Sequence, residues 1–316
     1  MKIFVIGATG FVGRHLTKRL IKEGHEVICG GRSFEKISEI LDKVKTAQID
    51  LRDKNSISNI IKAESPDVVY HAGALVMSSS YEDLRRTNVD GTENVLSACL
   101  ASGVKRVIYV SSVAVVSGNP ESPLTEDVPY KATNPYGQSK LEAEKIAVDY
   151  RKKGLKIAIL RPPFIYGEDD PHGLGRLIEG FKKRIIPILG AGKNRIHMVS
   201  VENLVDVLVL CLSKEEAYEG TYFVADSEAL SLRDMCEFIA KALNVRPPFV
   251  IPERIMKILL IIPFINKRVR FFMKDRIYSI KRLEEKLGYV PRISVHEGIK
   301  KAVLNFDWKR YKENTL

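Results

Sequence analysis

IFVIGATGFVG, residues Ile3–Gly13, is the stretch that decides the fold of this 316-residue chain. Its β-branched and aromatic start predicts a buried strand, and the apolar period of Val12–Glu23 predicts a helix directly after it. Gly7, Gly10 and Gly13 fill the turn between the two. Glycines allow a tight turn and a close backbone approach, and the helix N-terminus offers N–H donors and a positive dipole to a pyrophosphate. This context predicts a dinucleotide-binding turn rather than three structural glycines.

Further strand-like runs alternate with helical patterns along the first half of the chain. They are Glu26–Gly30, Ala47–Asp50, Asp67–His71, Arg106–Ser112 and Lys156–Arg161. The alternation indicates crossover units and a parallel sheet, and the nearly continuous apolar character of the runs predicts helices on both faces. We therefore expect an α/β fold, a Rossmann-type doubly wound parallel sheet with a smaller C-terminal substrate-binding region.

The pattern changes after Arg161, where prolines and glycines predict loops and short helices. Thr221–Ala225 predicts one more strand, and Leu232–Leu243 predicts a helix. We divide the chain into a dinucleotide-binding part, residues 1–165 with a later strand near 221–226, and a mostly substrate-binding, discontinuous part, residues 166–316.

The end of the second predicted strand indicates which dinucleotide fits. A carboxylate there would bond the ribose 2′-hydroxyl of NAD, whereas a nearby arginine accommodates the 2′-phosphate of NADP. This chain has the sequence Cys29-Gly30-Gly31-Arg32-Ser33 at that place, without an acid. We expect NAD or NADP as cofactor, and Arg32 favours NADP.

The segment NPYGQSK carries a candidate acid–base pair. Tyr136 and Lys140 are four residues apart and share one face if the segment is helical. A phenol has an unperturbed pKa of about 10, and a neighbouring ammonium would lower that pKa. A tyrosine tuned in this way exchanges a proton with a substrate hydroxyl while a hydride moves. Ser111 and Ser112 follow a predicted strand, where open α/β sheets bind ligands, so a serine hydroxyl can bond the same substrate oxygen.

Composition excludes several classes of protein. With 45% apolar and 28% charged residues, the chain is not a disordered tail, a collagen-like repeat or a disulfide-stapled mini-protein. The net charge is +11, and the last 51 residues hold 14 basic and 6 acidic side chains. Such an excess of positive charge favours binding of a phosphorylated ligand, an anionic membrane or nucleic acid. The alternative is that these side chains form a solvated basic surface without a partner. Without a basic stripe interleaved with aromatic residues, we expect no nucleic acid.

Cysteine and histidine spacing predicts no metal site. The four cysteines form no C-x-x-C pair, which argues against a zinc or redox site and fits a reducing compartment. His71, His172 and His197 lack metal-ligand spacing, and we expect structural or hydrogen-bonding roles for them. We see no signal peptide and no apolar stretch of ~18 residues, and we expect a cytoplasmic protein.

One segment has an unusual composition. It is apolar from Ile255 to Ile265 and is followed by Lys267, Arg268 and Arg270. A helix packed over the substrate pocket with its cationic end in water would look like this, and so would a helix on a membrane surface. We favour the first interpretation over membrane contact, because nearly all-round apolarity suits burial.

Seven motifs now occur in order and at familiar spacing. They are GATGFVG, DLRD at 50–53, YHAGA at 70–74, NVDGTENVL at 88–96, YVSS at 109–112, YGQSK and LRPPFIYG at 160–167. Together they resemble the extended short-chain dehydrogenases/reductases, the NAD-dependent epimerase/dehydratase group that includes UDP-galactose 4-epimerases and keto-sugar-nucleotide reductases. The resemblance is strong over residues 1–167 and weaker onward.

The resemblance implies roles by position. Ser112, Tyr136 and Lys140 would be the catalytic set, with Lys140 also bonding the nicotinamide ribose. Asn88 would brace the central helix. The cofactor contacts would be Gly7, Thr9, Gly10, Phe11, Val12, Gly13, Arg32, Asp50, Leu51, Ala72, Gly73, Ala74, Asn88, Tyr136, Lys140, Pro163 and Phe164. Members of the group are often dimers through a four-helix interface, so a homodimer is compatible with the resemblance.

Two departures from the sequence pattern of this group restrict the reactions that we expect. Its 4,6-dehydratases carry Asp-Glu after the catalytic hydroxyl residue, whereas Val113 and Ala114 follow Ser112 here, which argues against a dehydratase. Nucleotide-sugar enzymes place an arginine on the substrate diphosphate. That position falls on Ile196, with Arg195 one residue earlier, and Arg195 is our candidate substrate contact.

Three hypotheses for the function follow. The first is an NAD(P)-dependent epimerase or reductase of a nucleotide-activated sugar, with Tyr136 as acid–base. The alternative is a ketone reductase like 3β-hydroxysteroid dehydrogenase or dihydroflavonol reductase, which the apolar segment 255–265 favours. The third is a non-catalytic dinucleotide-binding protein, which we disfavour because Tyr136 and Lys140 are both present.

Overall fold

The computed structural model describes residues 1–78, 80–170, 177–180, 183, 187–252, 254–255 and 274–306. Its central sheet consists of the parallel strands β1 (Lys2–Ile6), β2 (Glu26–Gly31), β3 (Lys45–Gln48), β4 (Val68–His71), β5 (Arg106–Val110), β6 (Lys156–Arg161) and β11 (Thr221–Phe223). The strand order is β11-β6-β5-β4-β1-β2-β3. The order reverses between β1 and β4, which is the switch point where doubly wound sheets bind dinucleotides. The fold class expected from the sequence is confirmed.

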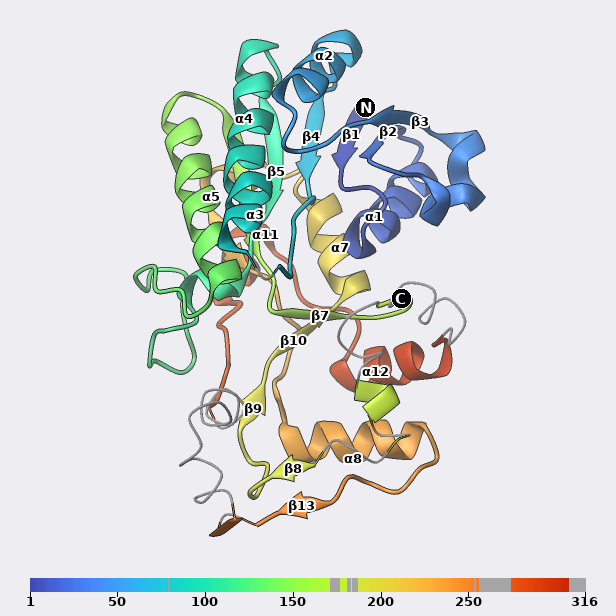
Figure 1. Cartoon of the computed structure of the whole chain (residues 1–316), viewed down its shortest axis with the longest axis vertical. Coiled ribbons are helices and arrows are strands. Elements are labelled where there is room, and N and C mark those ends of the chain that lie inside the picture. The colour runs from blue at the N-terminus through green and yellow to red at the C-terminus, as the bar shows by residue number, and fades with distance from the viewer. Residues whose placement is uncertain are drawn as a thin grey trace.

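Helices cover both faces of this sheet (Figure 1). On one face lie α1 (Phe11–Lys22) and α7 (Val201–Leu210), which pack against each other, and on the other lie α2 (Lys54–Glu64), α4 (Gly91–Ala101) and α5 (Pro135–Lys152). Strand β1 shows why both faces need cover, since Ile3 and Val5 join one buried cluster while Phe4 and Ile6 join the other. Side chains alternate along a strand, so a run of apolar residues is apolar on both faces.

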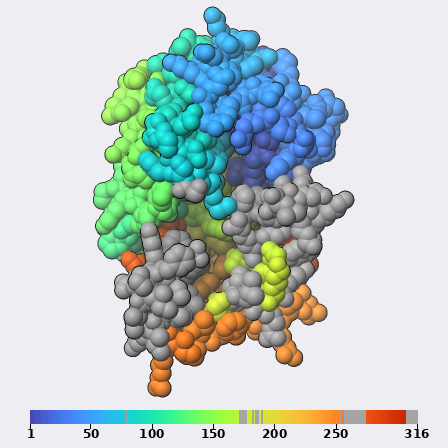
Figure 2. Space-filling model, in the orientation of Figure 1, coloured from blue at the N-terminus to red at the C-terminus, as the bar shows by residue number. Residues whose placement is uncertain are grey.

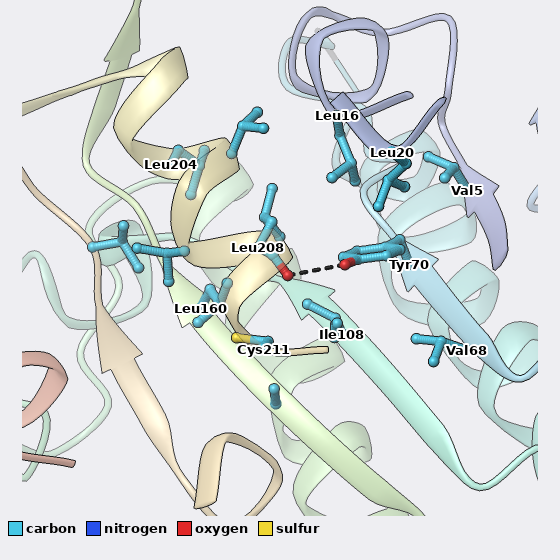
Figure 3. Packing of buried hydrophobic residues seen from close by; sticks show 14 of the residues in the cluster. Val5, Leu16, Leu20, Val68, Tyr70, Ile108, Leu160, Leu204, Leu208 and Cys211 are labelled. Atoms are coloured by element: carbon cyan, nitrogen blue, oxygen red, sulfur yellow. Dashed lines mark hydrogen bonds between the residues drawn. The ribbon is translucent and has the colours of Figure 1, made fainter. Parts of the chain in front are cut away.

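The buried cluster around α1 and α7 also contains a hydrogen bond that joins β4 to α7. Tyr70, on β4, is fully buried, and its hydroxyl donates a hydrogen bond of 2.9 Å to the carbonyl oxygen of Leu208 on α7 (Figure 3). The apolar side chains of Leu16, Leu20 and Cys211 lie around it. All four cysteines of the chain are buried free thiols. Helix α7 is therefore fixed to the sheet, although it is distant from β4 in the sequence.

The C-terminal region forms a separate layer at one end of the sheet (Figure 1). Its short strands pair two by two: β7 (Phe164–Tyr166) with β10 (Met198–Ser200), β8 (Ile188–Leu189) with β13 (Val250–Ile251), and β9 (Arg195–Ile196) with β12 (Leu230–Ser231). Helices α8 (Leu232–Ala242) and α12 (Val295–Leu304) pack beside them. The strand expected at Thr221–Ala225 and the helix expected at Leu232–Leu243 are present as β11 and α8. The short paired strands were not expected, because strands of two or three residues are too short to show an alternating pattern.

Shorter helical elements complete the described part of the chain. They are α3 (Tyr81–Leu84), the π-helical Arg85–Asp90, α11 (Lys281–Leu287) and the 3₁₀ helices Glu35–Lys43, Val113–Val116 and Glu215–Glu219. In the described part, none of the helices combines the length and the apolar character needed to span a bilayer. The apolar segment beyond Ile255, together with Lys267, Arg268, Arg270 and His172, lies outside the described residues. We keep the division of the chain after residue 165 as a proposal.

A buried ion pair fixes α5 against the end of β6. Glu144 is 0% exposed and Arg161 is 4% exposed, and the Arg161 Nε lies 3.0 and 3.2 Å from the two carboxylate oxygens. The Ser111 hydroxyl donates to one of these oxygens, and the Tyr130 hydroxyl donates to the other at 2.9 Å. A buried carboxylate is tolerated only when a countercharge and hydrogen bonds replace its hydration, as they do here.

We expect the loss of one partner of this pair to cost more than the loss of both. Arg161→Met should lower the free energy of unfolding by about 3–5 kcal/mol, because Glu144 becomes a buried charge without a countercharge. The double variant Glu144→Gln/Arg161→Met retains an acceptor for the two hydroxyls and should recover most of that loss. Urea denaturation followed by circular dichroism measures both. An equal loss in the single and the double variant would contradict this interpretation.

Candidate functional site

The turn between β1 and α1 brings three backbone segments into contact. Gly7 has a φ of +86°, and a Cβ on it would lie 2.6 Å from the backbone nitrogen of Gly73. A Cβ on Gly13 would lie 2.0 Å from the carbonyl oxygen of Gly7. Gly10 is the N-cap residue of α1, and no side chain in the described structure caps this helix. The N-terminus of α1 therefore keeps its first N–H groups and its positive dipole end available to an anion.

A cavity of about 520 Å³ lies in front of this turn. Figure 2 shows the surface hollowed between the blue and cyan N-terminal part and the orange C-terminal part. Of the expected cofactor contacts, those that line the cavity are Gly7, Thr9, Gly10, Arg32, Asp50, Leu51, Ala72, Gly73 and Ala74. Phe11, Val12, Gly13 and Asn88 are not in its wall. Phe11 and Val12 pack against the core instead.

The wall of this cavity contains two guanidinium groups, those of Arg32 and Arg52, and two carboxylates, those of Asp50 and Asp83. Arg52 binds the Asp50 carboxylate with two hydrogen bonds, Nε to Oδ1 at 3.0 Å and Nη2 to Oδ2 at 2.6 Å. These bonds, with a smaller effect of Arg32, lower the pKa of Asp50 to about 2. Arg32 follows β2, where Gly31 provides no acid, and Asp50 and Arg52 follow the neighbouring strand β3. Sequence analysis missed Arg52, although the DLRD motif contains it.

These observations fit a dinucleotide. At this turn the backbone segments approach so closely that no Cβ would fit. The N-terminus of α1 can receive a pyrophosphate, and the guanidinium of Arg32 can receive a phosphate on the ribose. A nicotinamide dinucleotide bound there would supply or accept a hydride.

Helix α5 holds two of the expected catalytic residues in one turn. Its N-cap residue, Asn134, accepts a hydrogen bond of 2.7 Å from the Gly137 nitrogen, and Pro135 occupies the first position, so both start the helix. Tyr136 and Lys140 therefore lie on one face of α5, as the spacing predicted. The Ser112 hydroxyl is within hydrogen-bonding contact of the half-buried Tyr136 side chain.

The Lys140 ammonium is held away from water. Its side chain is 2% exposed, Nζ donates to the Val110 carbonyl oxygen at 2.8 Å, and Nζ lies 4.4 Å from the centroid of the Tyr109 ring. Burial lowers the pKa of Lys140 from its usual 10.5 to about 7, and the nearby Glu144 carboxylate opposes that shift. Desolvation therefore brings the pKa of Lys140 close to neutral pH.

The pKa of Tyr136 moves in the direction opposite to our expectation. Burial raises it to about 12, and the bond with Ser112 offsets only part of the shift. Lys140 does not lower the pKa of Tyr136, because its ammonium is directed at Val110 and Tyr109. Tyr136 therefore keeps its proton at neutral pH in the protein without a dinucleotide, which is the state that a proton donor needs.

Asn88 connects the cofactor cavity to α5. Its Nδ2 donates to Ser139 Oγ at 2.9 Å and to the Leu75 carbonyl oxygen at 2.9 Å, and its Oδ1 accepts from the Leu75 nitrogen at 2.8 Å. Ser139 lies between Tyr136 and Lys140 on α5, and Leu75 lines the cavity. Asn88 thus joins α5 to the segment at Leu75 without lining the cavity itself. It sits in the π-helical turn Arg85–Asp90, a form that is frequent at functional sites.

A second cavity, of about 240 Å³, lies beside the segment that follows Ser112. Pro163 and Phe164, which we expected near the nicotinamide, line it together with Val113 and Ala114, the two residues after Ser112. Most of the remaining wall is apolar. The other residues of the wall are Ser117, Asn134, Leu177, Asn194, Ile196, His197, Met198, Leu232, Met235, Lys274, Arg276 and Tyr278.

The structure does not bring Arg195 into this cavity. Strand β9 pairs with β12, and its two side chains point to opposite sides. Ile196 lines the cavity, whereas Arg195 is 54% exposed and pairs with Asp275, with Nε at 3.2 Å and Nη2 at 3.1 Å from the Oδ2 oxygen. The cations that line the cavity are Lys274 and Arg276. Sequence analysis missed both, because no motif marks them.

The comparison with known proteins now decides the family. The model of the NAD dependent epimerase/dehydratase family matches residues 3–225. The chain belongs to this family. Its members are NAD-dependent epimerases, dehydratases and reductases, so the chain is an enzyme of the oxidoreductase type.

Relatives with different reactions are similar over nearly the whole chain. Identity is 27% to the 2-alkyl-3-oxoalkanoate reductase of Stenotrophomonas maltophilia (strain K279a), over 95% of this chain and 98% of that protein. It is 28% to the UDP-glucose 4-epimerase of Vibrio cholerae, over 96% and 95%. Among solved structures, the UDP-glucose 4-epimerase of Thermotoga maritima with UDP-glucose aligns with a TM-score of 0.81 at 23% identity, over 96% and 98%. That likeness shows the fold of the family.

The histidines near the site of this family member have structural partners. The Nδ1 of His197 accepts from the Tyr278 nitrogen at 3.2 Å, so Nε2 carries the proton and donates to the Asp226 carbonyl oxygen at 2.7 Å. Burial lowers the pKa of His197, which keeps the ring neutral. His71 Nε2 bonds the Thr92 hydroxyl at 2.9 Å. Within the described ranges, no three potential metal ligands come together.

We expect Lys140→Met to stabilise the fold and to abolish turnover. Between about pH 7 and 10.5 the unfolded chain binds the Lys140 proton that the folded protein has lost, so wild-type stability rises with pH over this window. The variant lacks that burial cost. Its Tm should exceed the wild-type Tm by about a few degrees at pH 6, and the difference should shrink above pH 9.

Thermal unfolding at both pH values measures the effect. Lys145→Met, which changes an exposed lysine on the same helix, is the matched control and should show no such dependence on pH. A Tm of Lys140→Met below that of the wild type at pH 6 would refute a burial cost at this lysine.

Proposed function

We propose that this enzyme is an NADP-dependent reductase or dehydrogenase that interconverts a ketone and an alcohol on an apolar substrate. The wall of the second cavity carries this proposal. Ile196, Met198, Leu232 and Met235 are part of it, and Ile196 stands where nucleotide-sugar enzymes would place an arginine. The relative named 2-alkyl-3-oxoalkanoate reductase, a reductase of oxo acids with alkyl chains, also supports it.

The roles of the catalytic residues follow from their contacts. Tyr136 would donate its proton to the carbonyl oxygen of the substrate while the bound dinucleotide supplies the hydride. Ser112, which is in hydrogen-bonding contact with Tyr136, would bond the same oxygen. The phenolate left on Tyr136 would lie one helical turn from the Lys140 ammonium, which would stabilise it until a proton returns.

The guanidinium groups in the wall of the first cavity support NADP over NAD. Arg32 and Arg52 both line it, and no carboxylate follows β2 to bond a ribose 2′-hydroxyl. Asp50 is already neutralised by Arg52. A 2′-phosphate would meet the guanidinium of Arg32, with the Arg52 guanidinium, which is paired with Asp50, beside it.

A second candidate is an epimerase of a nucleotide-activated sugar, the first hypothesis from the sequence. The Vibrio cholerae relative, named UDP-glucose 4-epimerase, supports it at 28% identity. An epimerase returns the hydride to the same substrate and so needs no net supply of reduced dinucleotide.

A comparison of substrates separates the two. We expect the protein to oxidise NADPH, followed at 340 nm, when 2-decanone or a steroid ketone is added, and to use NADH less well. Tyr136→Phe should lower kcat by about 10²–10⁴-fold, the usual contribution of a positioned proton donor. Tyr150→Phe, at the far end of the same helix, is the control and should retain activity. Epimerisation of UDP-glucose without consumption of NADPH, and no reduction of either ketone, would refute the proposal.

A further inference from the structure

We propose that Tyr109 is a positioning residue, whose aromatic face holds the Lys140 ammonium at the carboxyl end of β5, beside the proposed catalytic residues. This inference rests on the proposed function, in which Lys140 stabilises the phenolate of Tyr136. The contact between Tyr109 and Lys140 involves only residues of this chain, so it can be measured without turnover.

The Lys140 ammonium has few partners for a buried charge. Its side chain is buried, and Nζ donates to the Val110 carbonyl oxygen at 2.8 Å. Among the described residues, no carboxylate lies within ion-pair distance of Nζ, and Glu144, one turn further along α5, pairs with Arg161 instead. An ammonium has three N–H donors, so a single carbonyl oxygen does not replace its hydration.

The Tyr109 ring supplies a second interaction. Nζ lies 4.4 Å from the ring centroid, and the ring is fully buried on β5. The face of an aromatic ring is negative, and it attracts a cation most strongly where water is excluded. A lysine has a flexible four-carbon stem, so a fixed ring can determine where its charge lies. Here that place is beside Val110, the last residue of β5, two residues before Ser112.

The Tyr109 ring is itself held by a neighbouring histidine. His71 on β4 and Tyr109 on β5 are paired residues of adjacent strands, and their rings stack with centroids 5.2 Å apart and an interplanar angle of 30°. The Thr92 hydroxyl donates to the Asn88 carbonyl oxygen at 2.6 Å, so its oxygen accepts a hydrogen bond from His71 Nε2 at 2.9 Å. These bonds fix the His71 ring against α4, and the stacking fixes Tyr109.

The charged and titratable groups around Lys140 are compatible with this arrangement. His71 is neutral and does not repel the ammonium, because burial and Lys140 lower its pKa to about 3. Tyr109 is also uncharged, since burial raises its pKa. Tyr136, one turn before Lys140, keeps its proton at neutral pH. Glu144 attracts the ammonium and opposes the effect of burial on the pKa of Lys140.

Replacement of the ring by fluorinated phenylalanines tests this proposal. Fluorine withdraws electrons from the ring face and weakens its attraction for a cation, while the ring keeps nearly the same shape. Tyr109 would be replaced by phenylalanine, 3,5-difluorophenylalanine or pentafluorophenylalanine, and the lysines would carry ¹³C at Cε. NMR then follows the titration of Lys140 in the protein without added dinucleotide. The signal that Lys140→Met lacks is that of Lys140.

The pH at which Lys140 titrates should follow the electron density of the ring. Tyr109→Phe should titrate like the wild type, at about pH 7. Pentafluorophenylalanine should lower that pH by about one unit, because a desolvated contact between a cation and a ring is worth roughly that much. The smaller difluoro ring should lower it by less, so the test does not depend on one variant. Pentafluorophenylalanine in place of Phe4, a fully buried ring of the same apolar cluster, is the matched control and should not change the titration.

Turnover with NADPH and 2-decanone gives a second readout. At pH 7 the pentafluoro variant should have a kcat about fivefold below that of Tyr109→Phe with the same KM, in proportion to the charged fraction of Lys140. The difference should shrink at pH 6, where Lys140 regains its charge. A merely structural role of the ring would not produce this dependence on pH.

The outcomes separate this proposal from the proposed function. An identical titration of Lys140 in all the variants of Tyr109 would overturn the role of the ring, and so would an equal effect of the replacement of Phe4. Loss of turnover in Tyr109→Phe would assign the role to the hydroxyl and also overturn it. A titration that follows the fluorination, in a protein that reduces no ketone, would retain Tyr109 as the residue that positions Lys140 and refute the proposed reaction.

Discussion

The structure depends on a close approach of backbones at the turn after β1. Gly7 touches Gly73 beyond β4 and the start of α1 at Gly13, at distances where any side chain would displace the backbone. This contact locks β1, β4 and α1 together at the switch point of the sheet. In the described structure the N-terminus of α1 has no side-chain cap, and its N-cap residue Gly10 lines the first cavity. One local contact therefore joins the neighbouring strands β1 and β4 to the helix whose N-terminus faces the candidate cofactor site.

Helix α5 carries two buried charged side chains, Glu144 and Lys140, which differ in their effect on stability. Glu144 lies one turn after Lys140, is paired with Arg161 and is bonded by Ser111, so it anchors the helix that carries Tyr136. Lys140 is equally buried, but its partners are a carbonyl oxygen and an aromatic ring rather than a full countercharge. The first charge stabilises the helix and the second costs stability. A residue that costs stability and remains in a site is typical of function.

Much of the fold was predictable because its signals are local. The central strands are continuous apolar runs, and the glycine turn, the N-cap residue Asn134 and the spacing of Tyr136 and Lys140 all act within one element. The site was less predictable where it depends on register or solvation. On β9 Ile196 faces the cavity and the preceding Arg195 faces away from it. An error of one residue in the alignment of this strand therefore exchanges their roles. Arg276 reaches the cavity through pairing with a segment some 80 residues away. The pKa of Tyr136 depends on burial that spacing does not reveal.

A reductase of the proposed kind must exchange its dinucleotide in each turnover, whereas an epimerase retains it through the cycle. The most direct test is to purify the protein without added nucleotide, denature it and identify any released dinucleotide by mass spectrometry. This account predicts an empty site or NADP well below one per chain, with the 2′-phosphate held at Arg32 and Arg52. Stoichiometric NAD would contradict it, because a retained NAD is what an epimerase needs and what Arg32 in the cavity wall does not favour.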